Sequence, residues 1–119
     1  MLKTLELLNR SSIVKHHEVL DFKKGKDFYY LKIKAILIND TVLHIREYFS
    51  PDDKSYSYNW IDRDGNLICR WDNAPHYKHI KTFPHHKHTK DGIKESFETT
   101  LQDVLIVIEK EIKSIKSKI

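Results

Sequence analysis

The chain has 119 residues, of which 32% are charged and 39% hydrophobic, and its formal net charge is +4. This length leaves room for one hydrophobic core, so we predict a single domain over residues 1–119. The sequence contains no apolar run of the roughly 18 residues that a membrane helix needs, and its N-terminus lacks a signal-peptide core. Cys69 is the only cysteine, which excludes an internal disulfide and a four-cysteine zinc site. We therefore expect a cytoplasmic protein with no membrane partner.

Patterns of apolar residues predict a helix followed by a sheet. Leucines between residues 2 and 9 recur at mostly helical spacing, which indicates a short N-terminal helix. Alternating or nearly alternating apolar residues then predict five strands, over residues 13–22, 28–38, 41–49, 56–62 and 67–72. Short polar turns join these strands, so their neighbours must run antiparallel. The strongest turn signal is Asp64-Gly65, which is typical of a two-residue hairpin.

Residues 73–92 have no periodicity and contain Pro75 and Pro84, which predicts an ordered loop with a function. Apolar residues from Phe97 to Ile115 then recur at helical spacing, with Asp91 as the predicted N-cap. The predicted fold class is α+β: a five-stranded antiparallel meander with a short N-terminal helix and a long C-terminal helix packed on one face. The face under the helix is expected to carry Leu31, Ile33, Leu43 and Ile45.

The opposite face of the predicted sheet is basic. Lys32 and Lys34 alternate with apolar residues on one strand, and His44 and Arg46 do so on the next. Such a face can cradle a polyanion, with phosphate groups neutralised by the cations. A solvated lysine-rich face is equally compatible with the pattern, because antiparallel sheets often expose one side to water.

The stretch RWDNAPHYKHIKTFPHHKH, residues 70–88, concentrates groups that can move protons or bind anions. It holds five of the eight histidines of the chain. Arg70 and Asp72 are two residues apart on a strand and therefore project from the same face. Asp72 could hold the arginine fork in position for a phosphate, or orient a histidine by accepting its second ring N–H. Alternatively, Arg70 and Asp72 form only a surface ion pair, which contributes little to stability.

Three interpretations of the histidines remain open. In the first, they act as general base and acid, while Arg70 and Lys87 stabilise a phosphorane, as metal-free RNA cleavage requires. In the second, His76, His86 and His88 bind zinc or another divalent ion and leave a position for water, although no acidic third ligand is evident nearby. In the third, the segment is a solvated basic loop.

The aromatic residues of the strand at 56–62 could be core or could stack on bases. We expect Trp60 in the core and Tyr58 with its hydroxyl at the site. Glu47 lies on a predicted inward face, where its carboxylate would need an arginine or tyrosine partner. It is either a structural pair or a base with a raised pKa.

Several motifs resemble those of the TumE-like toxin family of bacterial and archaeal toxin–antitoxin modules. They are EY at 47–48, YSYNWID at 56–62, RWDNAPH at 70–76, TFPHHKH at 82–88 and LQDVL at 101–105. The resemblance covers roughly residues 28–108 and implies a small growth-slowing toxin, encoded beside an antitoxin that is commonly a helix-turn-helix DNA-binding protein. The family motif often has a second histidine after His76, where this chain has Tyr77. This departure favours His76 over Tyr77 as a catalytic position.

The leading hypothesis is a toxin that cuts RNA without a metal ion or other cofactor. His76, His86 and His88 would share the acid and base roles, Arg70 and Lys87 would stabilise the phosphate, and Asp72 would orient Arg70 or a histidine. The predicted RNA contacts are Lys32, Lys34, Arg46 and Tyr58. The alternatives are a binding module that inhibits its target without chemistry, and a metal-dependent nuclease with a histidine-bound ion. The cognate antitoxin and RNA are the expected partners, and a homodimer is a further possible assembly.

Overall fold

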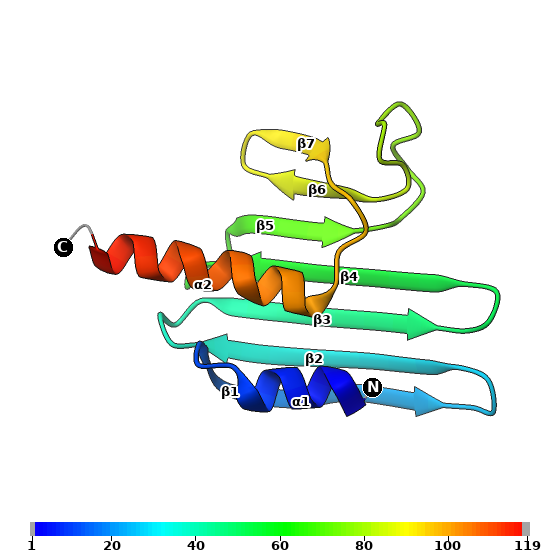
Figure 1. Cartoon of the computed structure of the whole chain (residues 1–119), viewed down its shortest axis with the longest axis horizontal. Coiled ribbons are helices and arrows are strands. Elements are labelled where there is room, and N and C mark those ends of the chain that lie inside the picture. Colours follow the sequence, from blue (N-terminus) through cyan, green and yellow to red (C-terminus); the bar gives the residue numbers. More distant parts are fainter. Residues whose placement is uncertain (1, 118–119) are drawn as a thin grey trace.

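The computed structural model describes residues 2–117 of the chain, and the side chains of residues 3–114. Seven strands form one antiparallel sheet, in which their order is the same as their order along the chain (Figure 1). The strands are β1 (Val14–Lys24), β2 (Tyr29–Leu37), β3 (Val42–Phe49), β4 (Lys54–Ile61), β5 (Leu67–Asp72), β6 (His86–Thr89) and β7 (Gly92–Glu95). The α+β class and the antiparallel meander are confirmed.

The predicted number of five strands is wrong, because residues 86–95 form a further hairpin, β6–β7. The four-residue strand HKHT carries no apolar residue, and all four residues of β7 are exposed. Neither strand therefore has the apolar alternation by which a sheet strand is recognised. The irregular connection between β5 and β6 is limited to residues 73–85.

Both helices, α1 (Leu2–Arg10) and α2 (Leu101–Ser117), lie on the same face of the sheet (Figure 1). The predicted helix start near Asp91 is wrong, because the chain is in β7 from Gly92 to Glu95 and helical only from Leu101. The N-cap is Thr100, whose hydroxyl and backbone N–H contact the Asp103 carboxylate while the hydroxyl accepts from the Asp103 N–H. The side chain of Ile115 lies outside the described residues. In the described part of the chain, no helix is long and apolar enough to span a membrane.

The hydrophobic core lies between the sheet and the two helices. The predicted inward residues Leu31, Ile33, Leu43 and Ile45 are each at most 1% exposed, so this prediction is confirmed. From α2, the core receives Leu101, Val104, Leu105, Ile108 and Ile112. We call this side of the sheet the helix face. The other side, which carries alternate residues such as Lys32, Arg46 and Asp72, is called the open face.

Candidate functional site

The candidate site is built around Asp72 at the end of β5, whose carboxylate is almost fully buried. Its Oδ1 atom accepts a hydrogen bond from the backbone N–H of Ala74 and lies 2.9 Å from His86 Nε2. Its Oδ2 atom accepts a 3.1 Å hydrogen bond from Arg70 Nε and lies 3.4 Å from His88 Nε2. One carboxylate therefore contacts one guanidinium and two imidazole groups.

Strand pairing brings these four side chains together. In the β5–β6 ladder, Arg70 pairs with His88 and Asp72 pairs with His86. Directly paired residues of antiparallel strands project from the same face, and so do residues two apart on one strand. All four side chains therefore lie on the open face. Because the sequence predicts a loop over residues 73–92, it does not predict this cross-strand pairing.

His86 is the most constrained member of the cluster. Its side chain is 2% exposed, and its Nδ1 atom lies 2.9 Å from the backbone carbonyl oxygen of Pro84. A carbonyl oxygen can only accept, so Nδ1 is the donor in this hydrogen bond. The opposite ring atom, Nε2, lies 2.9 Å from Asp72 Oδ1 but has no hydrogen-bond partner among the described residues. The ring is thus fixed in orientation, with Nε2 directed at the carboxylate.

His88 is more accessible, with a side chain that is 24% exposed. Burial lowers the pKa of His88 from its ordinary value, and Asp72 opposes this shift while His86 and Arg70 reinforce it. A histidine with a lowered pKa is neutral near pH 7 and can offer a lone pair to a proton or a metal ion. Asp72, His86 and His88 each offer a ligand atom, and these atoms lie within 4.8 Å of one another.

The loop between β5 and β6 covers the cluster through Tyr77, which the sequence analysis had set aside. The centroid of the Tyr77 ring lies 4.9 Å from that of His86 and 5.7 Å from that of His88, both in edge contacts. His76 is exposed and contacts the edge of Tyr77 instead of joining the cluster around Asp72. An aromatic residue at position 77, inside the stretch of residues 70–88, is visible in the sequence. The contacts of Tyr77 with His86 and His88, however, exist only in the folded structure.

Three further residues, Lys87, His85 and Tyr58, lie on the helix face. Lys87 pairs with Trp71 in the ladder, so its side chain projects away from His86 and His88. His85 also points to that face, where its Nδ1 atom lies 2.8 Å from the Tyr56 hydroxyl. Tyr58 is 3% exposed and belongs to the core. The structure therefore does not bring Lys87 or Tyr58 to the cluster at Asp72.

The basic residues predicted to contact RNA share the open face with the cluster. Two rows of directly paired residues cross β2 to β6. The first row is Lys32, Arg46, Ser57, Asp72 and His86. The second row is Lys34, His44, Asn59, Arg70 and His88. On β1, the acidic residues Glu18 and Asp21 lie opposite Lys34 and Lys32, while Lys23, over the Tyr30 ring, adds a further cation to the face.

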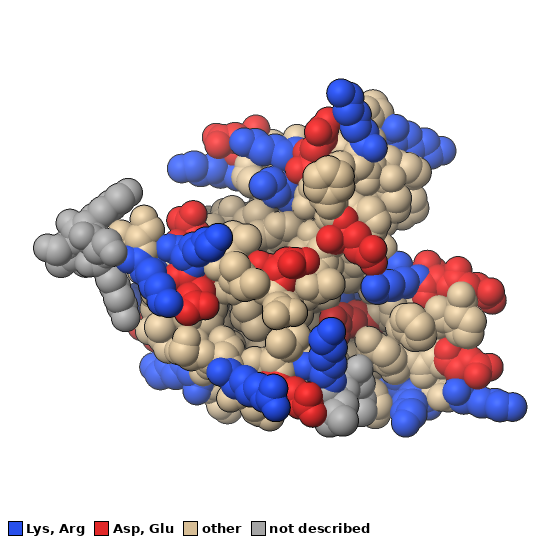
Figure 2. All heavy atoms as spheres, viewed as in Figure 1, with Lys and Arg blue, Asp and Glu red and all other residues tan. Residues whose placement is uncertain are grey.

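A shallow groove of about 240 Å³ runs along the middle of these rows, from Lys32 on β2 to Arg70 on β5. It is lined by Lys32, His44, Ile45, Arg46, Ser57, Asn59 and Arg70. Burial lowers the pKa of His44, and the neighbouring Lys34 and Lys32 lower it further. The lysines thus place positive charge along the groove, and Arg70 joins the groove to Asp72. On the side of the molecule shown in Figure 2, which carries the helices, blue and red side chains are instead interspersed.

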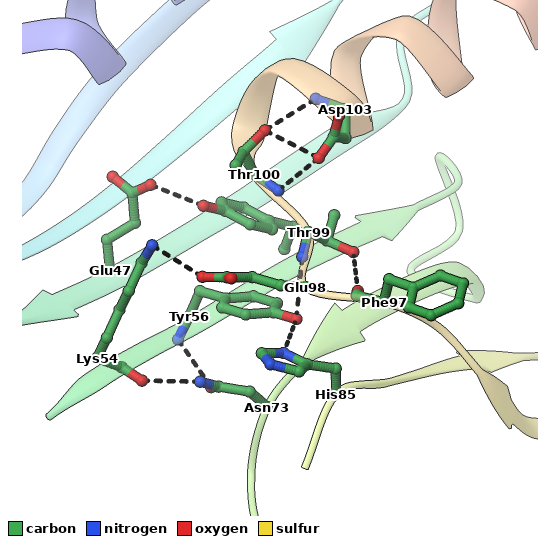
Figure 3. Close-up of polar contacts among 11 residues, drawn as sticks. Glu47, Lys54, Tyr56, Asn73, His85, Phe97, Glu98, Thr99, Thr100 and Asp103 are labelled. Atoms are coloured by element: carbon green, nitrogen blue, oxygen red, sulfur yellow. Dashed lines mark hydrogen bonds and ion pairs between the residues drawn. The ribbon is translucent and has the colours of Figure 1, made fainter. Parts of the chain in front are cut away.

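A second polar network lies on the helix face and ties the sheet to the start of α2 (Figure 3). The Tyr56 hydroxyl accepts from the backbone N–H of Thr99 and also contacts His85. Glu47 accepts hydrogen bonds of 2.7 Å from Tyr58 and 2.6 Å from the Thr4 hydroxyl. Burial raises the pKa of Tyr58, and the Glu47 carboxylate raises it further, which keeps this hydroxyl protonated as a donor. The predicted tyrosine partner of Glu47 is present.

We expect Tyr58→Phe to destabilise the protein by about 1–3 kcal/mol, because it removes a hydrogen bond to a part-buried carboxylate. Urea denaturation measures this loss, and Tyr30→Phe, which removes a hydroxyl from a half-buried position of the same sheet, is the matched control. The folded Tyr58→Phe variant should arrest growth as wild type does. Weaker growth arrest without loss of stability would contradict a purely structural role.

Comparison with known proteins identifies the family of this chain. A family model described as toxin TumE matches residues 4–115, which includes every residue of the cluster. Neither the search of curated proteins nor that of solved structures returned a match. Because the family model spans nearly the whole chain, the suspected resemblance is confirmed. The chain belongs to the TumE toxin family and is the toxin component of a toxin–antitoxin module.

Proposed function

We propose that this toxin cleaves RNA, with the reacting phosphate bound over Asp72, His88 and Arg70. The observation that carries this proposal is the alignment of the basic strands with the cluster, in two rows across one face. Adjacent strands are about 4.8 Å apart, so Lys32 on β2 is about 14 Å from Asp72 on β5. An RNA strand lying across the face would contact cations on β2 and β3 while one of its phosphates reaches β5.

The groups at the cluster fit phosphate chemistry. Arg70 is 44% exposed, so its guanidinium can bind a phosphate oxygen while Nε stays on Asp72. His88 is reachable from solvent and can take or give a proton. His86 is not free to do so, since its Nδ1 donates to Pro84 and its Nε2 faces Asp72. A metal-free mechanism would therefore need His76 to reach the phosphate from the loop, and the contacts of His86 favour the alternative with a histidine-bound ion.

The partner of a toxin in such a module is its cognate antitoxin. We propose that this antitoxin is a helix-turn-helix DNA-binding protein, as the family resemblance implies. The neighbouring reading frame provides the check. An adjacent gene without a helix-turn-helix pattern would contradict this part of the proposal.

Digestion of RNA by the purified toxin tests the proposal directly. We expect wild type to shorten single-stranded RNA, and the double variant Lys32→Glu/Arg46→Glu to bind RNA more weakly and with a shallower salt dependence. Each lost phosphate contact should reduce the slope of log K against log salt by about 0.7. The control Lys3→Glu/Lys110→Glu makes the same change in net charge at exposed positions on α1 and α2, and should retain the wild-type slope.

Two results would contradict the proposal. Equal loss of RNA binding in both double variants would mean that net charge matters and that the open face does not. Growth arrest that persists in folded His88→Ala, but is relieved by reversal of Lys32 and Arg46, would favour the non-enzymatic alternative, in which the same basic face inhibits a target without chemistry.

A further inference from the structure

We propose that Asp72, His86 and His88 together bind one divalent ion of the first transition series. The binding of the ion stands on the geometry alone, and its part in cleavage rests on the proposed function. From the sequence, one hypothesis is an ion held by His76, His86 and His88, with no acidic ligand evident nearby. Folding supplies that ligand, since β5 pairs with β6 and brings the Asp72 carboxylate to His86.

The first argument is the orientation of the His86 ring. Because Nδ1 donates to the Pro84 carbonyl oxygen, the neutral ring carries its lone pair on Nε2. This lone pair is 2.9 Å from Asp72 Oδ1, which is also an acceptor, and both side chains are at most 4% exposed. Two acceptors held so close in a buried place repel each other unless a positive group neutralises them. Arg70 does not fill this role between them, because its Nε atom is on Oδ2.

The second argument distinguishes a metal ion from an additional proton. A proton on His86 Nε2 would be expected to form a hydrogen bond to Oδ1, yet no hydrogen bond joins these atoms although they are 2.9 Å apart. A metal ion binds away from the line that joins its ligands. With metal–ligand bonds of about 2.1 Å, two atoms that are 2.9 Å apart subtend an angle of about 90° at the ion. This is the angle between adjacent ligands of an octahedral ion.

The third argument is the chemistry of the ligand set and its supports. Two imidazoles and one carboxylate on one side of an ion form a recognised set for divalent transition metals, and imidazole disfavours magnesium and calcium. Metal-binding histidines usually donate their other N–H to a carbonyl or carboxylate oxygen, as His86 does to Pro84. Arg70 holds Oδ2, and Oδ1, which accepts one hydrogen bond from the Ala74 N–H, keeps a second lone pair for the ion. His88 is partly exposed, so water or a phosphate oxygen can reach an ion from the His88 side of the cluster.

Cobalt titration of the full chain tests the proposal. The protein is purified without a metal-affinity tag, treated with chelator, dialysed and titrated with Co²⁺, and binding is followed by visible absorption and by calorimetry. We expect one equivalent of Co²⁺ per chain, displaced by Zn²⁺. Asp72→Ala and His88→Ala should each weaken binding by at least about tenfold. The control His76→Ala/His79→Ala removes two exposed histidines outside the cluster and should bind as wild type does.

Circular dichroism measures whether each variant is folded. If Asp72→Ala, a change at a buried position, does not fold, His88→Ala still tests the proposal. Absence of binding by folded wild type overturns the proposal. Equal binding by wild type and His88→Ala does so as well, because it shows that His88 is not a ligand. RNA digestion run in parallel separates the two hypotheses. Cleavage in excess chelator would show that the ion has no role in cleavage. Ion binding without any cleavage would contradict the ribonuclease proposal and leave the metal-site proposal intact.

Discussion

Asp72→Asn should abolish growth arrest and lower the proposed RNA cleavage by at least about 10²-fold. Asparagine has nearly the same shape as aspartate, and its side-chain oxygen can still accept from the Ala74 N–H. It has no charge, however, to balance Arg70, and its amide N–H₂ would replace one of the oxygens that face His86 and His88. Induced expression in cells measures growth arrest, and an RNA digest measures cleavage.

Asp91→Asn is the matched control for this substitution. Asp91 is exposed in the turn between β6 and β7, so the same chemical change there should leave toxicity intact. Far-UV circular dichroism and thermal unfolding establish that Asp72→Asn is folded. A folded Asp72→Asn variant that arrests growth as wild type does would remove this cluster from the mechanism.

Ile108→Ala should destabilise the protein by about 2–5 kcal/mol. Ile108 is fully buried where α2 packs on the sheet, so alanine leaves a cavity in the core. Domains are typically stable by only about 5–15 kcal/mol, and the loss would therefore be a large part of the total. Trp60 and Trp71 are both buried, so their fluorescence reports urea unfolding.

Ile106→Ala makes the same change on the same helix, at a side chain that is 45% exposed. Its effect should lie within about 0.5 kcal/mol of zero. Similar losses at the two positions would show that α2 does not pack on the sheet through the Ile108 side.

The central strands and the buried side of α2 could be predicted from the sequence, because the spacing of apolar residues that indicates them is a local pattern. From Leu31 to Ala35 in β2, apolar and polar residues alternate, and buried and half-buried positions alternate as far as Leu37. In β3, burial alternates from Val42 to Ile45. An error of one residue in register would expose every core side chain of such a strand, so the pattern fixes which face is buried. The predicted start of α2 was wrong because Phe97 continues the helical spacing of apolar residues. In the structure, Phe97 is 83% exposed and precedes the N-cap at Thr100.

The sequence by itself determined which segments carry the chemistry and, through its motifs, the toxin family. It also placed Lys32, Lys34 and Arg46 on the face away from the helices, because period-two alternation is a local property. Only the tertiary structure decided which groups meet. The short polar strand β6 has no apolar pattern, and its pairing with β5 is what brings His86 and His88 to Asp72 and turns Lys87 to the other side. Such a pairing depends on contacts between segments about 14 residues apart, which no local pattern encodes.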